Sequence, residues 1–112
     1  MATYKNLFID QGSDFNVTID LNPIVGSLVL TNYTGRGQVR KTYNSSTKTD
    51  FLVTLDSVNK ELVCNLTSAQ TGLLKSGRYV YDLEILSPDS PSIITRVIEG
   101  QVDVTPRVTL GA

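Results

Sequence analysis

Hydrophobic and polar residues alternate with a period of two in the segment that begins at Arg78. The apolar positions are Tyr79, Tyr81, Leu83 and Ile85, and the residues between them are Val80, Asp82 and Glu84. A polar, proline-bearing turn follows at Ser87–Pro91, and a second run extends from Ile93 to Val104. Successive side chains of a strand point to opposite faces, so this period predicts strands with one buried face. The short connection predicts an antiparallel hairpin.

The same alternation predicts further short strands along the chain. These strands cover Tyr4–Asp10, Phe15–Leu21, Arg36–Tyr43, Phe51–Leu55 and Leu62–Leu66. Gly35 and Gly37 mark a bulge or a close backbone approach in the third of them. Thr67–Gln70 can cap a single helical turn, and Asn22-Pro23 predicts a turn. About seven or eight strands at a spacing of roughly ten residues are typical of an all-β sandwich or small barrel.

The bulk numbers predict one globular domain over residues 1–112. The chain has 112 residues, of which 40% are hydrophobic and 19% charged, and its net charge is −1. Nothing resembles a basic stripe for nucleic acid or a polybasic patch for a membrane. We expect flexible or partner-ordered ends at residues 1–4 and 105–112. The first residues contain no apolar leader run, which predicts a soluble protein made in a reducing compartment.

Few residues offer catalytic or ligand chemistry. The chain has no histidine, which removes Ser-His-Asp and Cys-His systems and the commonest zinc ligand. Cys64 is the single cysteine and cannot form an internal disulfide. Its alignment with Leu62 and Leu66 predicts a buried side chain. No glycine-rich phosphate loop is present. We therefore predict no catalytic residue, no cofactor and no metal site.

Two acidic residues are the one generic catalytic option. Asp82 and Glu84 lie two positions apart and therefore share a strand face, opposite the apolar positions. That face is normally the solvated face of a sandwich strand. A small hydrolase that uses both carboxylates is the alternative, and it would require a cleft and a set separation between them.

Three arginines are candidate interface residues: Arg36, Arg40 and Arg96. Arginine is enriched in protein–protein interfaces. The alternative is that each forms a salt bridge on the sheet face with a neighbour such as Asp82 or Glu84, which adds little stability.

Two tyrosines are the best candidates for an exposed aromatic binding surface. Tyr33 and Tyr43 lie near the polar segment Asn44–Thr49, which predicts a loop at one end of the sandwich. Exposed aromatic residues on loops would suit a carbohydrate- or cell-surface-binding module. The alternative is that both tyrosines belong to the core or its rim.

Three segments together resemble a known group of proteins. They are Leu30–Arg40, Leu66–Glu84 and Arg96–Pro106, and Gln11-Gly12 precedes Phe15 as an opening turn. Their common features are LT-x-YT followed by QVR, G-x-Y-x-YDLE, and EG-x-V-x-V-x-P. The set resembles small immunoglobulin-like virion proteins of tailed bacteriophages and the N-terminal domain of phage baseplate upper proteins. The chain departs from that group between Leu21 and Leu30, where it is shorter and more irregular.

The resemblance implies an antiparallel Ig-like β-sandwich with a structural role. Such a protein is not an enzyme, is made in the host cytoplasm, and docks in multiple copies on the tail, baseplate or capsid of the virion. Its partners would be other virion proteins and further copies of itself. The alternative is a carbohydrate- or cell-surface-binding Ig-like module.

Free sheet edges can pair with another chain. We expect either the N-terminal strand Tyr4–Asp10 or the last strand Gly100–Val104 to make such a contact. Deleting residues 1–10 would then abolish incorporation into particles without unfolding the core.

Overall fold

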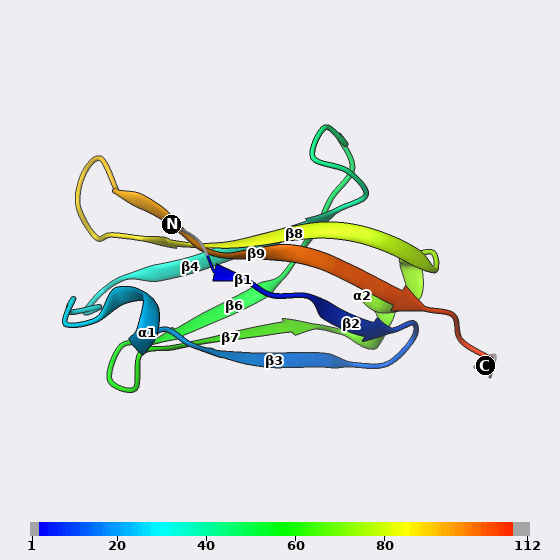
Figure 1. The fold of residues 1–112 in the computed structure, drawn as a ribbon, viewed down its shortest axis with the longest axis horizontal. Helices are drawn as coiled ribbons and strands as arrows, with labels where there is room; N and C mark the ends of the chain where they lie inside the picture. Colours follow the sequence, from blue (N-terminus) through cyan, green and yellow to red (C-terminus); the bar gives the residue numbers. More distant parts are fainter. Residues whose placement is uncertain (1–2, 109–112) are drawn as a thin grey trace.

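The protein, in a computed structural model that describes residues 3–108, is a sandwich-like β fold of two sheets (Figure 1). The described residues form nine strands: β1 (Thr3–Tyr4), β2 (Leu7–Asp10), β3 (Phe15–Asp20), β4 (Thr34–Arg40), β5 (Thr49–Asp50), β6 (Leu52–Asp56), β7 (Glu61–Leu66), β8 (Gly77–Leu86) and β9 (Ile94–Thr105). Two short helices join them, α1 (Asn22–Val25) and α2 (Ser68–Leu73). The prediction of a mostly β domain is confirmed.

The strands divide into a large sheet, here called sheet A, and a small sheet, sheet B. Sheet A has the order β1-β9-β8-β4-β5, with β2 also paired to β9, and sheet B has the order β3-β7-β6. The predicted hairpin of β8 and β9 is confirmed, since the two strands pair antiparallel from Gly77 opposite Val104 to Leu86 opposite Ile94. The two sheets lie face to face, with sheet B below sheet A in Figure 1.

Sheet A is mixed, so the prediction of a purely antiparallel sandwich is wrong. β1 and β2 run parallel to β9, with Thr3 opposite Ile98 and Leu7 opposite Val102. The reason is the connection that follows, because the chain turns after β2 and enters sheet B as β3. A short hairpin would force two successive strands to pair antiparallel. The strand that follows β2 lies in the other sheet, so no hairpin fixes the direction of β2 in sheet A.

The predicted strand Tyr4–Asp10 is broken into β1 and β2 where the chain crosses Gly100. A Cβ atom at Gly100 would overlap the carbonyl group of Lys5, so only glycine permits this close approach. The hydroxyl of Tyr81 donates a hydrogen bond of 2.5 Å to that same carbonyl. The break therefore has a specific partner on the neighbouring strand β9 and another on β8, the strand beyond it.

The core fills the space between the two inner faces. Its fully buried side chains include Ile9, Leu62, Leu83 and Val102, and they come from both sheets. Cys64 is also fully buried, as predicted. Phe51 packs against Phe15 and edge-on against Tyr81, with ring centroids 6.3 and 6.2 Å apart, which supplies bulk in a chain without tryptophan.

One local prediction is corrected and two are confirmed. Asn22–Val25 is helix α1 and not a simple turn, because Pro23 suits the first turn of a helix. Of the two alternatives predicted for Gly37, the close backbone approach is confirmed, since a Cβ there would overlap the Asp82 carbonyl oxygen and the Leu83 side chain. Thr67 and Gln70 form the predicted capping box of α2.

The expectation of flexible ends falls partly outside the described residues. Thr3, Tyr4 and Thr105 lie in strands. The expectation of flexible or partner-ordered ends stays a prediction. Residues 1–2 and 109–112 lie outside the described range.

Candidate functional site

The outer face of sheet A carries a polar groove of about 800 Å³, here called the sheet A groove. Its floor is formed by side chains of β4, β8 and β9, among them Gln38, Asp82 and Glu99. The loop between β4 and β5 stands away from the sheet on the side opposite sheet B (Figure 1), and its residue Tyr43 lines the groove. The charged lining residues thus lie on the outer face of the sheet, while Phe51, Val53 and Tyr81, which belong to the core or pack against it, also line the groove.

Strand alternation places the polar residues of β4 and β8 on this face. Arg36 lies opposite Glu84 and Gln38 opposite Asp82 in the antiparallel pairing of the two strands. Directly opposed residues share a face, while the residue between Arg36 and Gln38, Gly37, is buried on the inner side. Residues that lie more than forty positions apart in the sequence are therefore neighbours on the outer face of sheet A.

A β-bulge brings Arg96 to the same face. Leu83 pairs with Ile98, but the next residue, Glu84, pairs with Arg96, so Val97 is an extra residue in β9. From Ile98 onward the even-numbered residues of β9 are buried. In a regular strand that kept Val97, the Arg96 side chain would point inward like these even-numbered residues. The bulge turns it outward.

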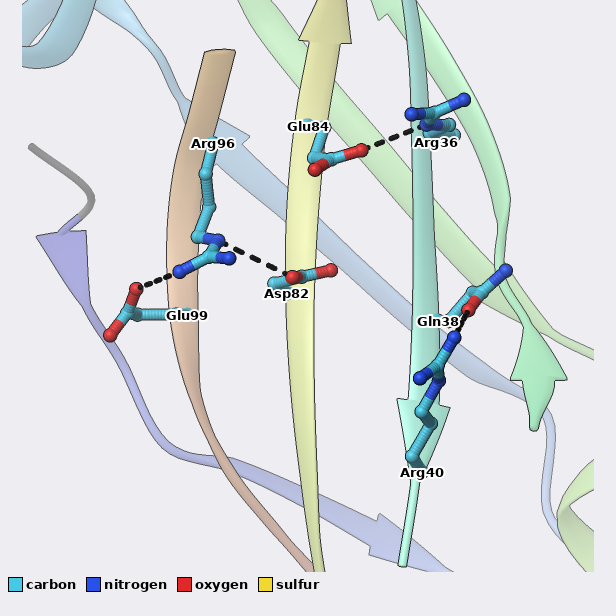
Figure 2. Close-up of polar contacts among 7 residues, drawn as sticks. All are labelled: Arg36, Gln38, Arg40, Asp82, Glu84, Arg96 and Glu99. Atoms are coloured by element: carbon cyan, nitrogen blue, oxygen red, sulfur yellow. Dashed lines mark hydrogen bonds and ion pairs between the residues drawn. The ribbon is translucent and has the colours of Figure 1, made fainter. Parts of the chain in front are cut away.

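The arginines and acids of the groove form ion pairs (Figure 2). Arg36 Nε lies 2.8 Å from Glu84 Oε1, and Arg96 Nε lies 3.3 Å from Asp82 Oδ2. Arg96 Nη1 also lies 3.2 Å from Glu99 Oε2. The salt-bridge interpretation of Arg36 and Arg96 is confirmed, and such exposed pairs add little stability.

Arg40 has a different partner from the other two arginines. Its Nη2 donates a hydrogen bond of 3.1 Å to the side-chain oxygen of Gln38 (Figure 2). A neutral acceptor leaves most of the guanidinium's five N–H donors available for other partners.

The carboxyl group of Asp82 has a raised pKa. Burial is the larger cause and the negative charge of Glu84 adds to it, while Arg96 and Arg40 act in the opposite direction. A raised pKa suits a general acid, but both carboxylates already hold arginines as ion-pair partners. The hydrolase alternative stays a prediction.

The structure separates the two candidate tyrosines. Tyr33 is half-buried, packs against the core and precedes β4, whereas Tyr43 follows β4 at its other end. Tyr43 is 71% exposed. The core-or-rim interpretation therefore applies to Tyr33, and Tyr43 is the exposed aromatic of the pair.

Sequence reasoning missed a second feature, an exposed aromatic edge. β1 and β2 form one edge of sheet A, and their residues Tyr4 and Phe8 are 58% and 69% exposed. The sequence contained a sign of this edge. Phe8 lies between the buried residues Leu7 and Ile9, so its side chain points outward, where alternation predicts a polar residue.

The edge hypothesis needs two corrections. The last strand, Gly100–Val104, is not an edge, because β9 pairs with β8 on one side and with β2 on the other. The expectation that residues 1–10 can be deleted without unfolding the core is also wrong. Leu7 is only 4% exposed and Ile9 is fully buried, so the deletion would remove two core side chains.

Within residues 3–108 no group of three or more His, Cys, Asp and Glu side chains is placed to hold a metal ion. No helix of this range is both long and apolar enough to span a membrane. Comparison with known protein families and with curated proteins finds no match to the chain.

Proposed function

We propose that this chain is a non-enzymatic structural or adaptor protein of a tailed-phage virion, docking in many copies on the tail, baseplate or capsid. The observation that carries the proposal is the resemblance of its three segments to small phage virion proteins. Those segments contain most of β4, β8 and β9. These strands are neighbours in sheet A, so the resemblance covers one continuous surface of the fold.

The strand order supports the finer assignment of an Ig-like sandwich. In immunoglobulin-type domains strands C, F and G form one sheet, extended by C′, and B, E and D lie in the other. If β3 is strand B, the order of the later strands follows this scheme: β4, β8 and β9 correspond to C, F and G, β5 to C′, and β7 and β6 to E and D.

A tyrosine near the start of β8 adds to this assignment. Ig-like domains carry a tyrosine at the start of strand F whose hydroxyl binds a backbone group a few residues upstream. The hydroxyl of Tyr79 donates a hydrogen bond of 2.7 Å to the carbonyl of Lys75. Tyr81, two residues later, occupies the position of the second cysteine in antibody domains.

The proposed docking contact is the edge formed by β1 and β2. A strand at a sheet edge presents backbone N–H and C=O groups that can pair with a strand of another chain. The exposed side chains of Tyr4 and Phe8 would add apolar contact area to that pairing. The partner is another virion protein or a second copy of this chain.

The test is mass spectrometry of purified particles of the phage that encodes the chain, together with immunogold labelling. We expect the chain in stoichiometric amounts at one place on the particle. Detection only in the lysate of infected cells, and never in the particle, would overturn the proposal.

A further inference from the structure

We propose that the sheet A groove binds a neutral oligosaccharide, with Tyr43 as the surface on which a sugar ring stacks. This binding activity goes beyond the docking function, which uses the β1–β2 edge. The groove and that edge are separate, because neither Tyr4 nor Phe8 lines the groove.

The size of the groove suits a small ligand. Its volume of about 800 Å³ lies in the range of roughly 300–1,000 Å³ that is common for ligand sites. A flat sheet face has no such volume. Here the loop between β4 and β5 rises from the sheet (Figure 1), and its residue Tyr43 lines the groove.

The polar groups of the floor are held in position before any ligand arrives. The ion pairs Arg36–Glu84 and Arg96–Asp82 each fix two planar groups on neighbouring strands (Figure 2). A guanidinium group has five N–H donors and a carboxylate accepts at both oxygens, so each pair keeps free donors and acceptors. Sugar hydroxyls both donate and accept, and they match a surface on which donors and acceptors alternate.

The charge balance favours a neutral ligand. The charged residues of the lining are three arginines, Arg36, Arg40 and Arg96, and four acids, Asp50, Asp82, Glu84 and Glu99. A site for an anionic polymer needs an excess of positive charge, which this groove lacks. A protein partner is also disfavoured, because Asp and Glu, of which the groove has four, are depleted in protein interfaces.

Tyr43 supplies the remaining requirement, an aromatic ring open to the ligand. Its side chain is 71% exposed although it borders the groove. Tyrosine combines an apolar ring face with a polar hydroxyl, and the C–H face of a sugar ring can pack on such a surface while its hydroxyls reach polar groups.

The test is a printed array of neutral and acidic oligosaccharides probed with the purified chain, followed by titration calorimetry with the neutral glycan that gives the strongest signal. We expect saturable binding to neutral glycans and an affinity at least about tenfold weaker in Tyr43→Ala. Phe8→Ala is the matched control, since Phe8 is similarly exposed, at 69%, and lies outside the groove. It should bind like the wild type.

Four results would overturn the inference. Three are no binding to any neutral glycan of the array, a preference for acidic glycans, and an equal loss of affinity in Tyr43→Ala and Phe8→Ala. The fourth is a virion protein that crosslinks to the groove with no glycan bound, which would assign the surface to protein docking. Particle incorporation is measured separately, so failure here leaves the virion proposal standing.

Discussion

Two tyrosine hydroxyls tie β8 to segments that precede it in the chain. Tyr79 donates to the carbonyl of Lys75 at 2.7 Å, and Tyr81 donates to that of Lys5 at 2.5 Å. Burial raises the pKa of the Tyr81 phenol, so this donor keeps its proton throughout the physiological range. The rings of these tyrosines thus fill the core, while their hydroxyls donate hydrogen bonds to the two backbone carbonyls.

Replacing Tyr79 by phenylalanine should lower the free energy of unfolding by about 1 kcal/mol, because the Lys75 carbonyl loses its donor while the ring packing is kept. Urea unfolding measures the change. Tyr43→Phe is the control, since its exposed hydroxyl should matter by less than about 0.5 kcal/mol. Equal stability of Tyr79→Phe and the wild type would contradict the role of this hydrogen bond.

The Cys64 thiol gives a pH dependence with a defined sign. Burial raises its pKa from 9.0 to about 12 in the folded protein. Between these values the unfolded chain has lost the thiol proton and the folded chain has kept it, so stability falls as pH rises above 9. The slope from this group approaches about 1.4 kcal/mol per pH unit.

Cys64→Val should remove that slope. Unfolding free energies of the two proteins, measured between pH 8 and 10.5, should therefore converge or cross in favour of the variant as pH rises. Curves that stay parallel across the range would show that the thiol titrates alike in both states.

At the scale of elements, the sequence predicted most strands and the α2 cap. Period-two alternation identifies a strand with one buried face, and β8 and β9 follow it over long runs. Alternation carries no information on strand direction, so the parallel pairing of β1 and β2 with β9 was missed. Likewise, the sequence named Arg36, Arg40 and Arg96 but could not show that they share one face, because that depends on strand register.

The bulge at Val97 lies beside Arg96, which lines the sheet A groove. Deleting Val97 would restore a regular ladder in which Ile98 stays opposite Leu83 and Arg96 stays opposite Glu84, so Arg96 would keep its outward direction. We expect a loss of about 2 kcal/mol in unfolding free energy, from the buried Val97 side chain alone.

Val97→Ala is the control for the lost side chain, with an expected cost of about 2 kcal/mol, because Val97 is fully buried. Urea unfolding compares the two variants. A deletion that costs several kcal/mol more than the alanine substitution would contradict the assigned register, because it would indicate that Arg96 had turned toward the core.

For the molecule as a whole, the N-terminal segment both completes the core and forms an edge. Leu7 and Ile9 point inward and are buried, while Phe8 between them points outward. Deleting residues 1–10 should cost about 4 kcal/mol, at roughly 2 kcal/mol for each of the two core side chains. Thermal unfolding of the truncated chain measures this, and an unchanged midpoint would contradict the assigned core.

We propose that the chain docks on a virion through its β1–β2 edge. The most direct test is the incorporation of variants into particles, quantified by mass spectrometry when wild type and variant compete in the same infected cells. Phe8→Lys places a charge at the edge, and Leu73→Lys changes a residue of α2 that is 86% exposed. We predict that Phe8→Lys is depleted from particles while Leu73→Lys is incorporated like the wild type. Equal incorporation of Phe8→Lys, or the absence of all three proteins from the particle, would contradict the account.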